Sequence, residues 1–482
     1  MSGIVFNQLP PNNFSPASWV ETGFGGGASN LPRGTLIVGY THGATPGPVL
    51  EPKLISGKTH EWPRNSQIAS KIRAFRRVNP YGELWAVALD DPSGGTAATR
   101  DVTVTGAATE DGTIPVYVAD HRVDVAVVSG DTAADVAAAI ETAVGTLADA
   151  PATASAASAV VTFTAVFTAE EGNQIVIDFA PKQGQKIPAG LGGLTRGNLT
   201  SGAGNGDITT ALATVKEKRF YAVDSGLVDS TAITDLVEEM ARRWLGTVEL
   251  HGQGFVGIQG AVAAMAALGT GYNAEEITAM GAGLSLSPPW DWASAAAAAD
   301  VAKSDPVTGW LGVKLTGLDA PETEFDAGER NTLLAAGVST FRVDSGGVIL
   351  DRLVTTRSKD ADDNTDVTLL PLSLRRTAEA LAFDWDSRVY NKYVSKNFKL
   401  ATAPDVQIPP PGSRILSQSA LRSEAVAWFI EKRAAGLVQD IDAFIAALNV
   451  QKNSGDPMRM DSFFSTTVLR ELVTLATRLE VN

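Results

Sequence analysis

The chain has no cysteine, only four histidines, and no apolar run of the roughly 20 residues that a membrane span needs. The lack of cysteine excludes disulfides, thiolate metal sites and thiol catalysis, and it fits a reducing compartment or an exposed particle without redox chemistry. Basic residues are outnumbered by acidic ones, 39 against 54, for a net charge of −15. This balance argues against nucleic-acid binding through a general basic surface.

Composition otherwise describes an ordinary folded protein. Apolar residues make up 44% of the 482 residues, which supports sizeable cores, and a chain of this length suggests roughly three domains of about 150 residues. The first residues lack the basic and long apolar regions of a secretory signal peptide. We therefore expect a soluble, acidic, multidomain protein without redox chemistry.

The first patterned stretch predicts a β–α–β unit. Residues 33–40 (RGTLIVGY) and 84–89 (LWAVAL) are apolar runs typical of buried strands. Between them, Ile68, Ile72 and Phe75 recur at helical spacing within 65–78, with Asn65 or Ser66 as N-cap.

After a turn at 90–95 the pattern becomes that of a β-rich block. Strands are predicted over 101–128, followed by one helix capped by Asp131 or Thr132 and by strands at 159–167 and 173–180. A glycine-rich stretch at 181–206 ends the block. We interpret 95–203 as a β-rich domain inserted into the α/β domain.

Alternating strand and helix patterns return after residue 204. The short loop DSGG at 344–347, between two apolar runs, predicts a hairpin. Other strands are predicted at 220–223, 247–250 and 277–281, and helices at 230–244, 293–303, 329–336, 374–393, 417–435 and 440–447.

The predicted fold class is thus α/β and α+β multidomain. Four parts follow from it: an N-terminal arm and linker at 1–30, a discontinuous α/β domain of 31–94 plus 204–373, the insert at 95–203, and a C-terminal domain at 374–482 that ends in a strand arm.

Gly252, Gly254 and Gly257 form a GxGxxG after the predicted strand at 247–250. A dinucleotide site needs an acidic residue at the end of the next strand, but Glu275 and Glu276 precede the strand predicted at 277–281. Glycines that allow close packing are the preferred interpretation, and an α/β nucleotide-binding enzyme is kept as an alternative.

Residues 360–366 (DADDNTD) begin like an EF-hand loop, but Thr365 and Pro371 stand where that loop needs Gly and Glu. We expect a solvated hairpin tip, with a structural cation as the alternative. The chain has no GxSxG and no evident catalytic triad, so we expect no catalytic, cofactor-binding or metal-binding residues.

The C-terminus reads as a half-buried strand, because Val473, Leu475, Leu479 and Val481 alternate with mostly polar residues. Nine such residues span roughly 30 Å. A free apolar-faced strand is an aggregation hazard. It therefore either pairs inside its own domain or serves as an arm for another subunit.

The N-terminus shows a similar pattern on a smaller scale. Ile4, Val5 and Phe6 form a short strand-like run, followed by an extended stretch rich in Pro, Asn and Gly. This is either a disordered leader or a second arm.

Several motifs carry a family resemblance. In the C-terminal third they are GLV at 436–438, DIDAF at 440–444, Asn453 with DPMRMD at 456–461, and the terminal strand; earlier ones are SPPWDWA at 287–293, ERNTLL at 329–334, TFRVD at 340–344 and RLVTT at 352–356. With them the chain resembles the contractile tail sheath proteins of Mu-like phages. The resemblance covers most of 30–90 and 205–482 and is loosest in 95–203.

This resemblance implies a structural, non-enzymatic subunit that polymerises as stacked hexameric rings around a tail tube and contracts to drive the tube through the host envelope. The implied partners are copies of the chain, the tail tube protein, and baseplate and tail terminator proteins, with no nucleic acid and no membrane span. The implied location is the virion tail, with assembly in the host cytoplasm. A tailocin or related contractile injection system is an alternative.

The family also implies which residues make contacts between subunits. Its terminal arms complete a sheet in a neighbouring subunit, a role that falls here on Ile4, Val5, Phe6, Val473, Leu475, Leu479 and Val481. Basic candidates for contact with an acidic tube are Lys392, Lys396, Lys399, Arg414 and Arg422, for which ordinary solvated charges are an equally good interpretation.

Overall fold

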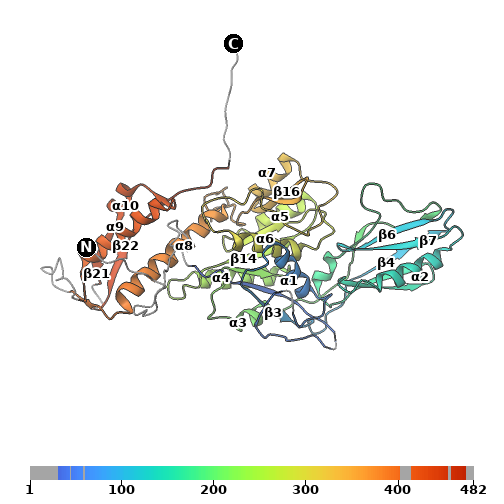
Figure 1. Ribbon diagram of the computed structural model, residues 1–482, viewed down its shortest axis with the longest axis horizontal. Coiled ribbons are helices and arrows are strands. Elements are labelled where there is room, and N and C mark those ends of the chain that lie inside the picture. Colours follow the sequence, from blue (N-terminus) through green and yellow to red (C-terminus); the bar gives the residue numbers. More distant parts are fainter. Residues whose placement is uncertain (1–30, 44, 58–59, 402–413, 454–457, 474–482) are drawn as a thin grey trace, which may run out of the picture. The chain divides into compact units, whose positions relative to one another are not determined.

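The computed structural model describes residues 31–43, 45–57, 60–401, 414–453 and 458–473 (Figure 1). They fall into two compact units, one made of 32–379 with the residues from 471 onward, and one made of 380–470 with the residues up to 31. Within the described ranges, no helix is both long enough and apolar enough to cross a membrane.

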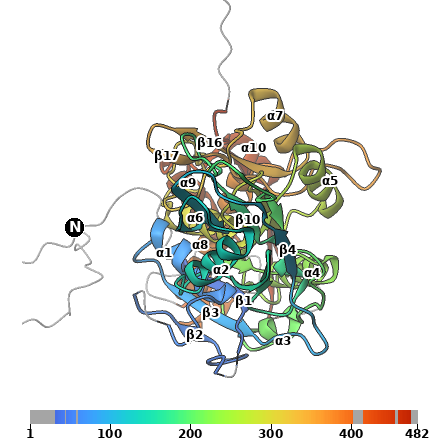
Figure 2. The same ribbon diagram turned by 90° about the vertical axis from the view of Figure 1, so that its right-hand side faces the viewer.

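The larger unit is built on a mixed eight-stranded sheet of order β17-β16-β15-β14-β13-β1-β3-β2. The six inner strands are parallel, whereas β2 and β17 run antiparallel to their neighbours. Figure 2 shows β1, β3 and β2 at one edge and β16 and β17 at the other. The strands are β1 (Thr35–Tyr40), β2 (Lys53–Leu54), β3 (Leu84–Leu89), β13 (Ala222–Ser225), β14 (Gln253–Ile258), β15 (Ile277–Gly281), β16 (Val338–Asp344) and β17 (Gly347–Arg352).

Helices cover both faces of this sheet. They are α1 (Gln67–Val78), α3 (Ile208–Ala213), α4 (Ser230–Arg243), α5 (Val262–Tyr272), α6 (Pro289–Ala302) and α7 (Ala327–Ala335). Helix α8 (Leu372–Val389) begins in the larger unit and ends in the smaller one. Helix α6 packs on β13, β14 and β15 and against α1, which packs on β1 and β3, and nearly all of its residues are buried. Its alanine-rich sequence fits this position, because small side chains let a helix approach a sheet and a second helix closely.

The predicted opening of the chain is confirmed. Strands β1 and β3 and helix α1 lie within the predicted ranges, and the Ser66 hydroxyl caps α1 by accepting a hydrogen bond from the Ala69 amide. Parallel pairing of β1 with β3 makes this a β–α–β unit. The mixed helix and strand content predicted for the whole chain is also confirmed.

Residues 99–198 form sheets of their own between β3 and β13, and within the described residues none of their strands joins the eight-stranded sheet (Figure 1). The sheet orders are β12-β10-β6-β7, β4-β9-β8 and β11-β5, with helix α2 packed on β8. The elements are β4 (Thr99–Thr103), β5 (Thr105–Gly106), β6 (Gly112–Val118), β7 (His121–Val127), α2 (Ala133–Val144), β8 (Ala152–Ala157), β9 (Val160–Ala165), a 3-10 turn η1 (Glu170–Gln174), β10 (Val176–Phe179), β11 (Leu191–Gly192) and β12 (Gly197–Asn198).

This β-rich segment is attached to the main sheet by buried contacts. Phe167 stacks on Tyr40 at a ring-centroid distance of 5.7 Å and meets Trp290 edge-on at 6.2 Å. The fully buried Glu171 accepts a 3.0 Å hydrogen bond from the amide of Val228, which follows β13. Segments far apart in the sequence are therefore joined by aromatic packing and a buried carboxylate.

The smaller unit surrounds an aromatic cluster. Trp385 of α8 packs on Trp428 of α9 at 5.4 Å, and Phe464 contacts both rings. Phe444 stacks on Phe429 at 4.2 Å. The elements are the end of α8, a π-helical turn η2 (Tyr390–Val394), β18 (Lys399–Leu400), β19 (Ile415–Leu416), α9 (Gln418–Ala434), β20 (Val438–Gln439), α10 (Ile441–Ala447), β21 (Asn449–Lys452), β22 (Met460–Phe463) and β23 (Thr467–Val468).

One predicted strand was wrong. Residues 247–250 are not a strand, and the strand of this region is β14 at Gln253–Ile258, which contains two of the GxGxxG glycines. Their absent side chains allow helices to approach both faces of β14, and this packing overrides the low strand propensity of glycine.

Candidate assembly surfaces

The C-terminal segment is attached to the larger unit just before the described residues end. Arg352, at the end of β17, donates from Nε and Nη2 to one carboxylate oxygen of Glu471, at 2.8 and 2.5 Å. The Glu471 side chain is only 6% exposed. Because this ion pair is largely buried, solvent screens it little, and it attaches the chain at Glu471 to the end of β17.

The residues after this ion pair turn toward solvent. Leu472 is 82% exposed and Val473 58% exposed. They line a cavity of about 260 Å³ together with Glu471, Trp310 and residues of α7, β16 and β17. Val473 therefore lies at the surface of the larger unit. The other predicted arm residues lie outside the described residues: Ile4, Val5, Phe6, Leu475, Leu479 and Val481.

Lys392 belongs to an ion cluster in the smaller unit. Its Nζ lies 2.5 Å from the carboxylate of Glu424, which also pairs with Arg388 at 2.5 Å. Arg388 makes a second pair with Glu431 at 2.6 Å. The cluster joins α8 and η2 to α9, and the Lys392 side chain stays half exposed.

The other basic candidates have different surroundings. Lys396, Lys399 and Arg414 are exposed, and the parallel pairing of β18 with β19 gathers them, with the Arg414 guanidinium 3.4 Å from the Lys396 carbonyl. Arg422 instead donates to the carbonyls of Ile445 and Leu448 at the end of α10, where a cation satisfies open acceptors. Among the five, Arg422 therefore has the clearest structural role.

A buried network around Arg376 fixes the first turns of α8, and sequence reasoning missed it. Its guanidinium donates to Asp300 of α6, to Glu379 at 2.7 Å and to the Tyr221 carbonyl at 2.9 Å. Burial lowers the Arg376 pKa, but the neighbouring carboxylates outweigh this and raise it above its usual range. The partners are distant in sequence and carry no motif, so no pattern marked them.

A second buried ion pair lies between α1, α6 and the sheet. Lys71 donates to Asp224 at 2.7 Å with both side chains fully buried, and the Ser294 hydroxyl donates to the other oxygen of the same carboxylate. Burial raises the pKa of Asp224 and lowers that of Lys71. Either charge alone would be strongly unfavourable in this buried position. A lysine at 71 on α1 therefore requires an acid at 224 on β13.

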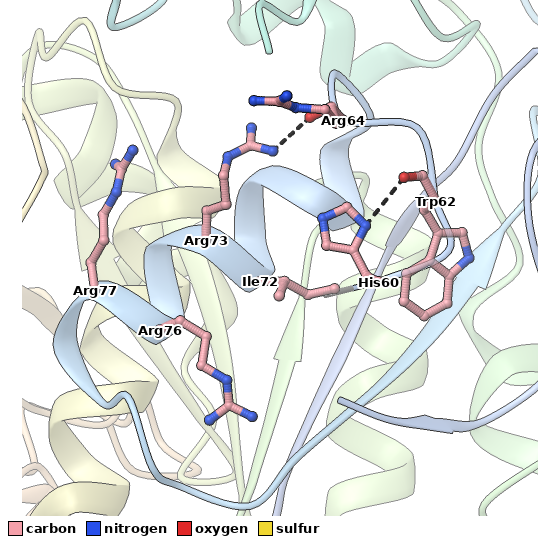
Figure 3. A pocket seen from close by; sticks show the side chains of 7 residues that line it. All are labelled: His60, Trp62, Arg64, Ile72, Arg73, Arg76 and Arg77. Carbon is pink, nitrogen blue, oxygen red and sulfur yellow. Dashed lines mark hydrogen bonds between the residues drawn. The ribbon is translucent and has the colours of Figure 1, made fainter. Parts of the chain in front are cut away.

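Beside α1 lies a pocket of about 390 Å³ in which every charged lining residue is basic (Figure 3). Arg76 is engaged locally, donating to several backbone carbonyls including those of Gly57 and Ile55. Burial lowers the pKa of His60. The lining residues are His60, Trp62, Arg64, Ile72, Arg73, Arg76 and Arg77.

The glycine motif packs against neighbouring elements, as the sequence favoured. A Cβ on Gly257 would stand 1.8 Å from the Pro289 carbonyl oxygen, and one on Gly252 would stand 2.2 Å from that of Phe220. A Cβ on Gly254 would meet the Ile277 side chain at 2.9 Å. These glycines allow α6 and the adjoining strands to approach β14, and their positions are not those of a phosphate-binding turn between a strand and a helix.

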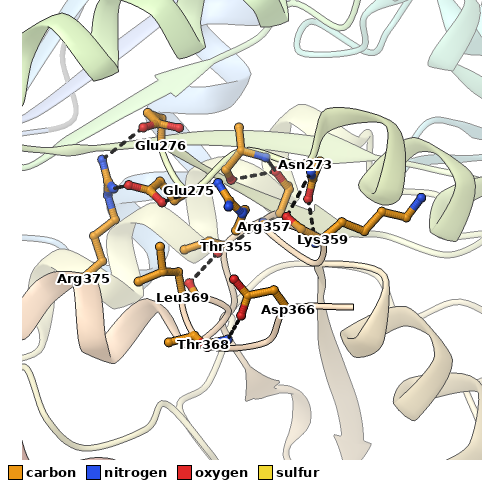
Figure 4. Close-up of polar contacts among 12 residues, drawn as sticks. Asn273, Glu275, Glu276, Thr355, Arg357, Lys359, Asp366, Thr368, Leu369 and Arg375 are labelled. Carbon is orange, nitrogen blue, oxygen red and sulfur yellow. Dashed lines mark hydrogen bonds and ion pairs between the residues drawn. The ribbon is translucent and has the colours of Figure 1, made fainter. Parts of the chain in front are cut away.

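The acidic segment at 360–366 is a hairpin tip, as predicted. Lys359 bridges Thr365, and the Asp360 carboxylate accepts 2.9 Å hydrogen bonds from the amides of Asp362 and Asn364. The Asn273 side chain holds the base of the loop by accepting from the amide of Lys359 (Figure 4). In the described part of the chain, no group of three His, Asp or Glu is arranged to hold a metal ion.

The SPPWDWA motif begins a helix, so the helix predicted at 293–303 starts earlier, at Pro289. Pro289 is the first residue of α6, and the rings of Trp290 and Trp292 are buried. Trp292 lies 4.5 Å from the ring of Phe341. The two tryptophans therefore act as core anchors.

The chain matches known sheath proteins. Residues 201–356 match the family model of the phage tail sheath protein central domain. These residues contain β13 to β17 and thus most of the eight-stranded sheet. The Mu-like prophage FluMu tail sheath protein of Haemophilus influenzae is 28% identical over 469 residues, which are 95% of each chain.

The comparison with solved structures also gives two sheath proteins. The sheath tail protein of Desulfitobacterium hafniense has a TM-score of 0.48 and 12% identity, covering 94% of this chain and 99% of its own. The helical sheath of the anti-feeding prophage in its contracted state has a TM-score of 0.46 and 10% identity, covering 98% of this chain and all of its own. From the family match and the near full-length sequence similarity, the predicted resemblance is confirmed: the chain carries a phage tail sheath central domain and is a relative of the Mu-like tail sheath proteins.

Proposed function

We propose that this chain is the repeating subunit of a contractile tail sheath, which polymerises as stacked hexameric rings around a tail tube and contracts to drive the tube through the host envelope. The observation that carries the sheath role is the match of residues 201–356 to the sheath central domain, within a similarity that spans 95% of the chain. The ring stacking and the contraction extend that role.

The subunits are linked through their terminal arms. Support comes from the alternating pattern of 473–481 and from the Arg352–Glu471 pair, which fixes the chain immediately before that pattern begins. Val473, Leu475, Leu479 and Val481 then add a strand to a neighbour, and Ile4, Val5 and Phe6 contribute to the same kind of joint. Such head-to-tail contacts do not close on themselves, so they build a helical polymer.

The role is structural, without catalysis. The GxGxxG was the sequence feature that favoured a nucleotide-binding enzyme, and its glycines pack against neighbouring strands and helices instead. The remaining partners are the tail tube protein and the baseplate and tail terminator proteins, in the virion tail after assembly in the host cytoplasm. Lys396, Lys399 and Arg414, which lie together at the surface of the smaller unit, are the strongest candidates for contact with the tube.

Negative-stain electron microscopy of the purified full-length chain, alone and with its tube protein, tests this function. We expect hollow striated tubes or stacks of rings, and large species in size-exclusion chromatography that grow with protein concentration. A uniform monomer or small closed oligomer at all concentrations, with the tube protein present, would contradict the proposal.

A further inference from the structure

The arginine-lined pocket beside α1 stands out in a chain whose net charge is −15. Copies of an acidic chain repel one another, so a polymer of this chain needs local patches of opposite charge where neighbours meet. Figure 3 shows Arg73 and Arg77, one helical turn apart on α1, extending in the same direction, while Arg76 points away from them.

Arg73 and Arg77 are incompletely bonded. Arg73 donates from Nη1 to the Arg64 carbonyl at 2.6 Å, whereas its Nη2 is buried and forms no hydrogen bond to any described residue. Arg77 donates to the Gly317 carbonyl at 3.0 Å. Within the described residues, neither guanidinium forms an ion pair. A buried donor without an acceptor is unfavourable, so an acceptor from outside would stabilise this site.

The acids near the pocket have other partners, and among the described residues none forms an ion pair with Arg73 or Arg77. Asp149 holds Arg64 through two bonds of 2.8 and 3.1 Å, and the buried Asp291 accepts a 2.8 Å bond from the Ser70 hydroxyl with one carboxylate oxygen, while its other oxygen has no hydrogen-bond partner. These neighbours leave Arg73 and Arg77 as the cationic groups that an incoming carboxylate can reach.

The hairpin tip at 360–366 supplies such a carboxylate. Four of its seven residues are aspartates, residues 361–365 are exposed, and bonds to Asn273 hold its base in place (Figure 4). Asp360 and Asp366 bond to the loop's own amides, and Asp363 lies 3.3 Å from Lys359. The Asp362 carboxylate, at the tip, makes no bond to another described residue.

Another acidic stretch, at 322–329, is less suitable. In 322–329, Asp326 and Glu329 form a capping box at the start of α7, so their carboxylates are bonded to its backbone. The other two acids of this segment, Glu322 and Glu324, are exposed. The tip at 360–366 is the better candidate because it combines an open carboxylate with a base that is bonded to Asn273.

We infer that the pocket receives the acidic tip 360–366 of a second copy of this chain, with Arg73 and Arg77 binding the Asp362 carboxylate. This contact rests on the proposed sheath function and adds to the arms a second link between subunits. Paired guanidinium groups suit it because each presents a planar set of donors to a carboxylate.

Cross-linking in assembled tubes tests the contact, and the absence of native cysteine makes single-cysteine variants specific. Arg77→Cys and Asp362→Cys proteins are mixed, assembled and treated with a short bismaleimide, because a direct disulfide requires Cα atoms within about 7 Å and an Arg–Asp contact is longer. We expect a covalent dimer that neither variant gives alone. Lys216→Cys, at an exposed lysine outside the pocket, replaces Arg77→Cys in the control mixture.

Charge exchange supplies an independent measurement. Arg77→Glu or Asp362→Arg alone should raise the concentration needed for tubes by about tenfold, and the double variant should restore it. Lys216→Glu should leave it unchanged. Thermal melting of each variant verifies folding.

The outcomes separate this contact from the sheath function. Two results would overturn the contact alone. One is normal tubes that give no cross-linked product between positions 77 and 362 above the Lys216→Cys control. The other is a double charge variant that assembles as poorly as the single variants. Pocket occupation by another part of the same chain would also leave no such product. Failure of the unmodified chain to form tubes overturns the sheath function and this inference with it.

Discussion

Gly257 marks the closest approach of β14 to α6. A Cβ there would lie 1.8 Å from the Pro289 carbonyl oxygen, so the strand and the helix must separate to admit it. We expect Gly257→Ala to lower the free energy of unfolding by about 1–3 kcal/mol or more, as overpacking does. Urea denaturation measures this. Gly271→Ala, inside α5 with nothing within 4 Å of the added methyl, should be neutral or stabilising by about 0.5–1 kcal/mol.

Glu171 makes stability depend on pH. Burial raises the pKa of this carboxyl to about 7. The folded state therefore binds a proton that the unfolded state releases near pH 4, so this contribution is present at low pH and is lost as pH rises to 7. From that shift we expect the wild-type chain to lose roughly 2–3 kcal/mol of stability between pH 5 and pH 8 through this group.

Glu171→Gln removes this dependence while keeping an acceptor for the Val228 amide. Chemical denaturation at pH 5, 6, 7 and 8 should show a flatter profile for the variant, with its advantage over wild type greatest at pH 8. The exposed neighbour Glu170→Gln is the matched control and should follow wild type. Parallel profiles for all three chains would refute a buried protonated Glu171.

At the scale of elements, α8 begins in a buried network that only arginine can satisfy. Arg376 reaches Asp300, Glu379 and the Tyr221 carbonyl at once with its planar donors. Lysine has one charged nitrogen and would leave buried acceptors open, so we expect Arg376→Lys to cost about 3 kcal/mol in thermal or urea unfolding. The exposed pair Arg122–Asp124 provides the control, because Arg122→Lys should change stability by less than about 1 kcal/mol.

The spacing of apolar residues predicted those helices and strands in which it shows clearly which side chains are buried. The continuous apolar run of β1, which is buried on both faces, and the helical spacing of α1 and α9 were sufficient. The spacing failed at β14, where glycines form a strand because neighbouring elements press on both faces. It also passed over β8, whose alanines and serine give little contrast between faces. In both strands the structure is decided by the elements that pack on them, and the strand's own sequence does not show which elements these are.

The assembly surfaces divide in the same way. The alternation after Val473 is local and was visible in the sequence, whereas Arg352 and Glu471 are 119 residues apart and carry no motif. The arginine pocket is partly local, since Arg73, Arg76 and Arg77 share α1. Its significance depends on the fold, which leaves Arg73 with a buried nitrogen that has no acceptor. The mixed helix and strand content and the sheath resemblance therefore followed from sequence patterns, whereas the ion pairs required the structure.

At the scale of the whole molecule, the arm and the body should be separable. A chain that ends at Val473 keeps the Arg352–Glu471 pair and every other described contact. We therefore expect it to melt within about 2 °C of the full chain, because stability follows the surface buried within the body. Electron microscopy should show no tubes, since the strand that we propose joins neighbours is gone.

The control for this deletion is full-length Glu471→Gln. It weakens the attachment of the segment but keeps residues 474–482, so tubes should form at higher protein concentration. Deletion of residues 1–30 should resemble the C-terminal deletion if the two arms meet in one joint. Normal tubes from a chain that ends at Val473 would sink the arm hypothesis, and the acidic tip with its arginine pocket would then be the contact left to hold subunits together. A truncated chain that fails to fold would instead place residues 474–482 in the sheet of their own subunit, which is the alternative that the alternating pattern left open.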